Sequence, residues 1–419
     1  MPDATTAISA EQMRHVLDVS RLLVVTADLD MLLRRIAEAA TSLLCAERAS
    51  IFLHDDVRKQ LWTKIALGAG EIRVPDSAGI VGHVFHANQL LNIPDAYADS
   101  RFNREVDRKT GFVTRNLLTI PLPDVDHKPI GVLQVVNKIG GSFLSNDEAM
   151  IELLAGQAGV AIQRYNLQRS AIQSAELRHE MQLARKVQDR LIPQQSPGVD
   201  GLDAVGWTLP ASIAGGDCFD LWKMSDGKLG IFLGDASGHG LAPAMIVSQA
   251  RTLIRALSEI DCNPMWLLAR VNRRLGSDME DSRFVTAFVG CITPDGQVTW
   301  YSAGHGPVFV RQGPDAPLEM LIPQAPPLGV DPDMPSEEPA VLCLAPGGQL
   351  IVVSDGIFEA PHSGRRELFG IERVVELFDR CKGDSPAAIL TCLRESVQRW
   401  QGGEEPADDQ TVVIIRRNA

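Results

Sequence analysis

Residues 228–240 read KLGIFLGDASGHG, an apolar run that ends at Gly234 and leads directly into Asp235 and a series of small residues. Such a short apolar run is typical of a buried strand, and the glycines after it favour a tight turn. The pattern therefore places the Asp235 carboxylate at a strand end, where a rigid backbone fixes its direction.

Three further segments combine an acid, small residues and an apolar run: GGDCFD at 215–220, SDG at 354–356 and DDQT at 408–411. A single Asp-Gly pair is more often a turn than a ligand, but four such segments in this context favour a shared site. Converging carboxylates repel unless cations lie among them, and Mg²⁺ or Mn²⁺ prefers such oxygens. Two such ions would activate water and neutralise a phosphoryl group, so the pattern predicts phosphoester hydrolysis.

The surrounding sequence predicts an α+β fold in the C-terminal half. Apolar runs resembling strands alternate with helical patterns near 241–258, 263–275, 371–382 and 385–400, which indicates sheets covered by helices. The Pro-rich stretch from Gly313 to Pro339 predicts a long surface loop.

The N-terminal half predicts a second domain of a different kind. Helical patterns cover residues 11–24 and 28–44, and Asp28 or Asp30 is the expected N-cap of the second helix. Strand-like runs from Ala49 to Val136 and a helical pattern at 147–167 complete one α+β domain with a mixed sheet.

A helical segment connects the two halves. Residues 165–191 contain no Gly or Pro and end before Pro193. The apolar positions partly follow a seven-residue rhythm, which Ser170, Ser174 and Gln188 interrupt. A coiled-coil homodimer is one interpretation of this rhythm, and a single connecting helix is the other.

Bulk properties restrict the function classes. The 419 residues suffice for two domains, and a net charge of -13 gives no support to a nucleic-acid or anionic-membrane partner. Seven scattered cysteines without CxxC spacing favour reduced thiols in a cytoplasm. No apolar run reaches the length of a membrane span, and no basic leader with an apolar core is found.

The ordered segments GGDCFD, GDASGHG, TAFVGCITPDG, YSAGHGPVFV, PPLGV, SDGIFEA and DDQTVVII resemble the motifs of SpoIIE-type, RsbU-like members of the metal-dependent protein phosphatase (PPM) family. The resemblance covers about residues 180–417. It implies an αββα sandwich of two antiparallel sheets flanked by helices, and serine/threonine phosphatase activity with two Mn²⁺ or Mg²⁺ ions.

The same resemblance implies roles for individual residues. Asp217 and Asp235 correspond to ligands of the binuclear pair, with Asp235 bridging the ions and Ala236 offering its backbone carbonyl. Asp355 and Asp408 would complete the sphere of one ion. These four aspartates are the predicted catalytic residues.

Other residues in the motifs allow two readings. Asp409 is either a ligand or a partner that supports Asp408, and Asp220 either orients the site or is a solvated turn carboxylate. His239 and His305 either meet the phosphate or pack within their loops. Cys218 is not expected to be a nucleophile, because the C-x5-R phosphate cradle of cysteine phosphatases is missing.

The N-terminal segments SRFNREVDRKTGFVTRNLLTIPL and PIGVLQVVNKIGGSF resemble a GAF domain. Five residues match the NKFDE signature of GAF domains in cyclic-nucleotide phosphodiesterases: Asn137, Lys138, Phe143, Asp147 and Glu148. They are candidate binding residues for a cyclic nucleotide or another small ligand. Alternatively, Lys138 and Asp147 form a salt bridge that locks the fold.

These observations predict four parts: an N-terminal helical segment (1–27), a GAF sensory domain (28–165), a switch helix (166–195) and a phosphatase domain (196–419). The resemblance implies a phosphorylated protein substrate, such as a STAS-type anti-sigma-factor antagonist. The alternative is a catalytically silent scaffold that binds a small ligand and partner proteins. A cyclic-nucleotide phosphodiesterase is disfavoured, because residues 196–419 lack a histidine-rich metal signature.

Overall fold

The computed structural model describes residues 28–63, 72–238, 240–276, 283–333 and 338–418. The chain divides into two compact units, Met1–Ser174 and Ala175–Ala419. The helix expected at 11–24 lies outside the described residues. In the described ranges, no helix combines the length and apolar character needed to cross a membrane.

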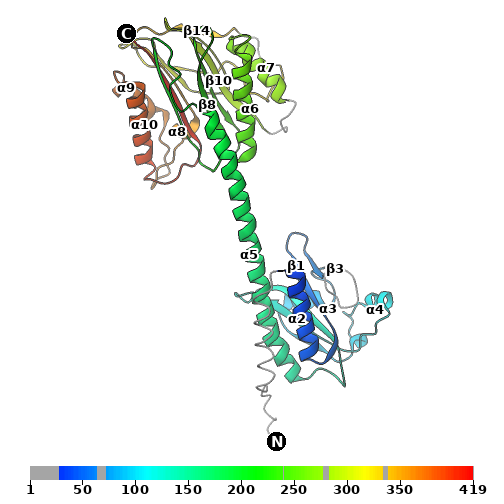
Figure 1. Cartoon of the computed structure of the whole chain (residues 1–419). Helices are drawn as coiled ribbons and strands as arrows, with labels where there is room; N and C mark the ends of the chain where they lie inside the picture. The colour runs from blue at the N-terminus through cyan, green and yellow to red at the C-terminus, as the bar shows by residue number, and fades with distance from the viewer. Residues whose placement is uncertain (1–27, 64–71, 239, 277–282, 334–337, 419) are drawn as a thin grey trace. The chain divides into compact units, whose positions relative to one another are not determined.

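The first unit is built on one six-stranded sheet (Figure 1). Its elements are α2 (Leu29–Leu43), β1 (Ala46–Asp55), β2 (Gln60–Thr63), β3 (Ile72–Pro75), α3 (Gly79–Ala87), β4 (Leu91–Ile93), η1 (Ala96–Ala98), α4 (Arg104–Thr110), β5 (Leu117–Pro123), β6 (Pro129–Lys138) and the first part of α5 (Ser145–Leu191). The strand order is β3-β2-β1-β6-β5-β4, and every neighbouring pair is antiparallel. The α+β class is confirmed, but the sheet is antiparallel rather than mixed.

Different helices cover the two faces of this sheet. Successive residues of a strand point to opposite faces, so neighbouring residues of β1 pack against different helices. Ile51 and Leu53 of β1 pack with buried residues of α2 and the first part of α5. Phe52, between them, packs with α3 on the other face. The Asp28 side chain accepts a hydrogen bond from the Met31 N–H at 2.9 Å, which confirms the predicted N-cap of α2.

The helix expected at 147–167 and the connecting helix after it form one continuous element, α5. Gly159 permits the close approach of α5 to β5, because a Cβ at this position would collide with the Pro123 carbonyl oxygen.

The second unit has two five-stranded antiparallel sheets, with strand orders β14-β11-β10-β9-β8 and β13-β12-β15-β16-β7. Its strands are β7 (Leu202–Leu209), β8 (Asp217–Lys223), β9 (Leu229–Ala236), β10 (Val285–Ile292), β11 (Gln297–Ala303), β12 (Val308–Arg311), β13 (Glu319–Leu321), β14 (Ala340–Cys343), β15 (Gln349–Val353) and β16 (Gln410–Arg417). Its further helices are α6 (Leu241–Leu257), α7 (Pro264–Gly276), α8 (Asp355–Phe358), α9 (Ile371–Arg380) and α10 (Pro386–Trp400).

Three apolar clusters hold these layers together. One lies between the sheets, and the other two pack α6 and α7 on the first sheet and α9 and α10 on the second. The predicted αββα sandwich is therefore confirmed. The Pro-rich stretch from Gly313 to Pro339 is not wholly a surface loop, because it contains β13 and the fully buried Leu328, which bridges to Val285.

Candidate metal centre

The four predicted catalytic aspartates come from both sheets of the sandwich. Asp217 is the first residue of β8 and is paired directly with Asp235, near the end of β9. Asp355 is the first residue of α8, shortly after β15. Asp408 lies two positions before the first residue of β16. Since β15 and β16 are neighbours in the second sheet, two strand ends of each sheet contribute an acid.

These carboxylates influence one another electrostatically. Burial raises the pKa of Asp235 to about 7, and the negative charges of Asp355 and Asp408 add to this rise. Burial also raises the pKa of Asp217 well above its usual range, with Asp235 as a further cause. The pKa of Asp355 is raised by burial and then by Asp408. The carboxylates of the cluster therefore repel one another.

The donor set fits divalent cations. Asp217 is only 3% exposed, and its Oδ2 atom is buried without a hydrogen-bond partner. A Cβ at Gly216 would lie 2.6 Å from the Ala236 carbonyl oxygen and 3.3 Å from Asp235 Oδ1, so glycine leaves both oxygens uncovered. Among the described residues, no three His, Cys, Asp or Glu side chains lie close enough together to hold a metal ion. A cation would replace their repulsion by attraction.

Asp408 and Asp409 have different surroundings. Both oxygens of Asp409 accept backbone N–H groups, from Ala211 at 2.7 Å and from Asp217 at 3.2 Å. Asp408 is exposed, and its Oδ1 atom accepts the Asp409 N–H at 2.8 Å. This geometry supports Asp408 as the ligand and Asp409 as the side chain that holds the start of β8 in place.

The structure separates Asp220 from the candidate ligands. Its carboxylate is fully buried on the other face of β8, where Arg251 and Arg255 of α6 lie 2.7 Å and 3.0 Å from it. The alternation of strand side chains sends Asp217 and Asp220 to opposite faces. Asp220 is therefore a buried partner of two arginines rather than a solvated turn residue.

Two of the remaining candidates, His305 and Cys218, are buried. Burial lowers the pKa of His305 to about 4, and its Nδ1 atom lies 3.0 Å from Thr286 Oγ1. Neutral and buried, His305 fits the packing interpretation. Burial raises the pKa of Cys218 to about 12, which excludes a thiolate nucleophile at neutral pH. His239 lies outside the described residues.

Sequence reasoning missed the role of Gln188. This α5 residue is 5% exposed, and its Nε2 atom donates to the carbonyl oxygens of Gly215 at 2.8 Å and Asp217 at 3.4 Å. Its Oε1 atom accepts the Gly215 N–H at 3.4 Å. The available signal was a glutamine that interrupts the apolar seam, in the helix that precedes GGDCFD.

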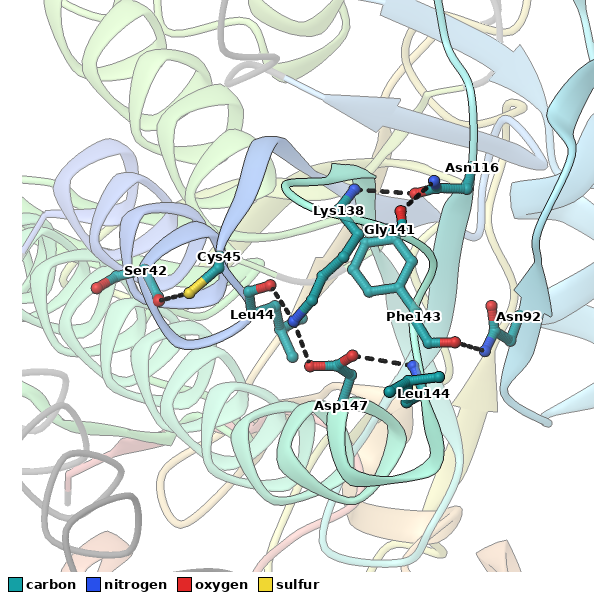
Figure 2. A network of polar contacts seen from close by, with 10 residues as sticks. All are labelled: Ser42, Leu44, Cys45, Asn92, Asn116, Lys138, Gly141, Phe143, Leu144 and Asp147. Atoms are coloured by element: carbon teal, nitrogen blue, oxygen red, sulfur yellow. Dashed lines mark hydrogen bonds and ion pairs between the residues drawn. The ribbon is translucent and has the colours of Figure 1, made fainter.

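Three of the five NKFDE residues, Lys138, Phe143 and Asp147, take part in a network of polar contacts in the first unit (Figure 2). The Lys138 ammonium donates to the Leu44 carbonyl at 2.9 Å and to Asp147 Oδ1 at 2.7 Å, while Asp147 Oδ2 accepts the Leu144 N–H at 2.9 Å. These bonds join the end of α2 to β6 and to the start of α5. The salt-bridge interpretation is therefore the one that the structure shows.

The other signature residues are equally engaged. Asn137 is fully buried and donates to Glu47 and to the Val113 carbonyl, while its Oδ1 atom accepts the Arg115 N–H. Asn92 donates to the Phe143 carbonyl and to Glu148 at 2.8 Å. All five signature residues therefore take part in contacts within the unit, and their ligand-binding role stays a prediction.

A cavity of about 420 Å³ lies elsewhere in this unit. Its lining includes Ser50 and Phe52 of β1, Gln134 of β6, and Arg48, which lies 4.0 Å from the centre of the Phe112 ring. These β1 residues alternate with Ile51 and Leu53, so the cavity lies on the sheet face away from α2 and α5.

Comparison with solved structures places the second unit in the PP2C-like phosphatase fold. The SiaA-PP2C domain of Pseudomonas aeruginosa matches with a TM-score of 0.52 at 18% identity, covering 59% of this chain and 100% of that chain. The RsbU and RsbW domains of Rv1364c from Mycobacterium tuberculosis give a TM-score of 0.46 at 26% identity, covering 55% of this chain and 64% of that chain.

The family models define the two parts of the chain. Residues 225–418 match the model of stage II sporulation protein E (SpoIIE), and residues 28–162 match the model of the GAF domain. The chain therefore combines an N-terminal GAF domain with a SpoIIE PP2C-type phosphatase domain.

Curated relatives share only a part of this chain. The probable 3',5'-cyclic phosphodiesterase pde-5 of Caenorhabditis elegans is 35% identical over 153 residues, 33% of this chain and 21% of that protein. The dual 3',5'-cyclic-AMP and -GMP phosphodiesterase 11A of Takifugu rubripes is 34% identical over 155 residues, 33% of this chain and 17% of that protein. The chain thus spans about a fifth of the length of these relatives.

Proposed function

We propose that this chain is a metal-dependent protein phosphatase that hydrolyses phosphoserine and phosphothreonine on a partner protein. The observation that carries the proposal is the set of four carboxylates at strand ends of two sheets, three of which have pKa values raised by burial and by neighbouring carboxylates. Asp217, Asp235, Asp355, Asp408 and the Ala236 carbonyl would hold two Mn²⁺ or Mg²⁺ ions. Bound there, the ions supply an activated water and offset phosphoryl charge during in-line displacement.

The surrounding residues hold this donor set in position. Asp409 fixes the backbone N–H of Asp217, and Gln188 fixes the backbone carbonyls on either side of Gly216. Since Gln188 belongs to α5, a shift of this helix would move the backbone that carries Asp217. We therefore assign α5 as the element through which the GAF unit regulates the metal centre.

The decisive experiment measures Mn²⁺-dependent hydrolysis of a phosphoserine peptide. Asp235→Asn should lower kcat by about a hundredfold to a thousandfold, since removal of one electrostatic group from a reaction centre has an effect of this order. Asp226→Asn is the matched control, because Asp226 lies in a turn beside Lys228 at 2.7 Å, outside the cluster. Absence of metal-dependent turnover, or equal turnover in both variants, would refute the enzyme assignment and leave the scaffold.

The proposed substrate is a phosphorylated anti-sigma-factor antagonist of the STAS type, on the basis of the motif resemblance. The test compares kcat/KM for such a phosphoprotein with that for its isolated phosphopeptide. If the phosphoprotein docks on the phosphatase domain, its kcat/KM should be at least about tenfold higher than that of the peptide, which corresponds to about 1.4 kcal/mol. Equal values would remove this substrate assignment without affecting the phosphatase assignment.

The GAF cavity is the proposed site of a small regulatory ligand, with cyclic nucleotides as the first candidates. Its arginine, amide and hydroxyl groups beside aromatic rings suit an anion with a flat ring system. Calorimetry of the full chain with cyclic AMP and cyclic GMP should give binding heat that Gln134→Leu weakens. Absence of heat at high micromolar ligand would exclude both nucleotides.

We also propose that the protein is a cytoplasmic homodimer. All seven cysteines are free thiols, which suits a reducing compartment. Leu153, Val160 and Leu167 of α5 are exposed at seven-residue intervals, as expected for a helix face that meets a second copy.

A further inference from the structure

The segment 361–368, between α8 and α9, forms a tight loop, which we call the arginine loop. Its two ends, Pro361 and Leu368, pair as an antiparallel bridge. Within it, the His362 N–H donates to the Glu367 carbonyl oxygen at 2.9 Å. The backbone of the loop is therefore closed on itself and has a defined shape.

Side chains of α9 and α10 hold the arginine loop in place. The Trp400 and His362 rings meet edge to face with their centres 4.6 Å apart, and Trp400 Nε1 donates to the Ala360 carbonyl at 3.2 Å. The Arg373 guanidinium lies 4.1 Å from the centre of the Trp400 ring and 2.6 Å from Glu367 Oε1. Arg373 and Glu367 therefore balance each other's charge within this support.

Two connections place the arginine loop at the edge of the second sheet that carries acids of the candidate metal centre. On one side, the Gly370 N–H donates to the Phe358 carbonyl at 2.8 Å, and Phe358 ends the helix that Asp355 begins. On the other side, Gln401 follows the supporting tryptophan and accepts a hydrogen bond from Gln410 Nε2 at 3.1 Å. Gln410 is the first residue of β16. The loop therefore borders the strand ends from which the acids of this sheet come.

The tip of the arginine loop presents two positive charges to solvent. Arg365 and Arg366 are both exposed. In the described part of the chain, neither guanidinium lies within ion-pair distance of a carboxylate, although Glu404 and Glu405 are exposed in the segment after α10. The chain carries a net charge of -13, so these two free cations are a local exception to the charge of the molecule.

We propose that Arg365 and Arg366 dock acidic side chains of the protein substrate, close to its phosphorylated residue. This inference rests on the proposed phosphatase function and adds a substrate class, a phosphoprotein whose phosphorylated segment is rich in Asp and Glu. A guanidinium offers a planar fork of N–H donors that matches a carboxylate, and charges at the rim of an interface select the partner. Because α8 spans about 6 Å and an extended peptide advances about 3.3 Å per residue, the docked acids lie within about six positions of the phosphorylated residue.

The test measures kcat/KM of the full chain with Mn²⁺ for two phosphoserine peptides. One peptide has glutamates on both sides of the phosphoserine, and the other has glutamines at the same positions. At an ionic strength of about 0.01 M, kcat/KM for the acidic peptide should be at least about threefold higher, an effect of the order of two exposed ion pairs. At about 1 M the screening length falls to about 3 Å, and the ratio should fall to about one. Equal values at low ionic strength would overturn the proposal.

Two variants assign the preference to the arginine loop. The double variant Arg365→Gln and Arg366→Gln should bring the ratio of the two kcat/KM values to about one. Lys223→Gln should keep the wild-type ratio, because Lys223 is exposed at the opposite end of β8 from Asp217. The ratio compares two substrates on one protein sample, so a partly unfolded variant does not imitate the effect. A preference that persists in the double variant, or that Lys223→Gln abolishes equally, would contradict the docking role.

A binding measurement separates docking from catalysis. If neither peptide is hydrolysed, the phosphatase proposal fails, and fluorescence anisotropy of the same two labelled peptides decides the docking by itself. The wild-type chain should bind the acidic peptide at least about threefold more tightly than the neutral one, and the double variant should bind both alike. Equal affinities of the wild-type chain for the two peptides would overturn the docking site, whatever the result for hydrolysis.

Discussion

At the scale of the residue, Asp217 and Asp220 show how neighbours in one motif take different roles. Both acids belong to GGDCFD, but they are three positions apart along the strand, so their side chains point to opposite faces of β8. Asp217 meets Asp235 and the side chains of Ser354 and Thr411, whereas Asp220 meets two arginines of α6. The face of β8 on which each acid lies therefore decides whether it meets the other carboxylates or the arginines of α6.

Asp220→Asn should destabilise the second unit by about 2–3 kcal/mol, since it leaves a buried arginine without its charge partner. The loss stays below that of a fully buried pair because the Arg255 side chain is 47% exposed. Urea unfolding measures the change in free energy of unfolding. The control Asp226→Asn should cost less than about 1 kcal/mol, because its ion pair is largely solvated, and equal losses would contradict this assignment.

Gln188→Leu should weaken the response to metal while the fold is retained. The variant removes the hydrogen bonds to the Gly215 and Asp217 carbonyls, so the backbone around the ligand loses its positioning. We expect at least about a tenfold rise in the Mn²⁺ concentration for half-maximal activity, or about 1.4 kcal/mol. Gln194→Leu, beyond the end of α5, is the matched control, and a fall in kcat at unchanged metal response would oppose the positioning role.

At the scale of the element, α5 serves two environments along its length. Its later residues Met181, Ala184 and Gln188 are partly or fully buried within the second unit, while Leu153, Val160 and Leu167 are exposed in the first. The sequence alone predicts a single seam of apolar positions along residues 165–191, interrupted by Gln188, although these positions belong to two different surfaces. Buried Gln188 is therefore a contact of the phosphatase unit rather than a defect in a coiled coil.

The double variant Val160→Lys and Leu167→Lys should dissociate the proposed dimer, because like charges replace apolar contacts at one face. Sedimentation equilibrium should show the dimer dissociation constant raised by at least about tenfold. Val57→Lys is the control, since Val57 is 94% exposed in the turn after β1. A wild-type chain that sediments as a monomer would disprove the dimer.

At the scale of the whole molecule, the two units carry separate machinery: a cavity in one and a carboxylate cluster in the other. A ligand that binds only the folded form of one unit stabilises that unit by mass action. The metal should therefore raise the melting temperature of the second unit, and a ligand of the GAF cavity should raise that of the first unit.

Addition of Mn²⁺ at about a hundred times its dissociation constant should raise the melting temperature of the second unit by about 5–10 °C. Differential scanning calorimetry measures this shift, and a chelator should reverse it. Asp235→Asn should lose the shift, whereas Asp226→Asn should keep it. A shift confined to the transition of the first unit would place the metal elsewhere.

The sequence by itself determined the elements that depend on local patterns. Apolar periodicity and capping residues such as Asp28 located the long helices and central strands, because these signals act within a few residues. The order of the aspartate segments located the four candidate ligands. Only the tertiary structure gave Asp408 and Asp409 different surroundings, put Asp220 beside two arginines, placed Gln188 next to Asp217 and formed a cavity in the first unit. Each of these depends on which face a side chain presents and which distant backbone meets it, and strand pairing and packing set both.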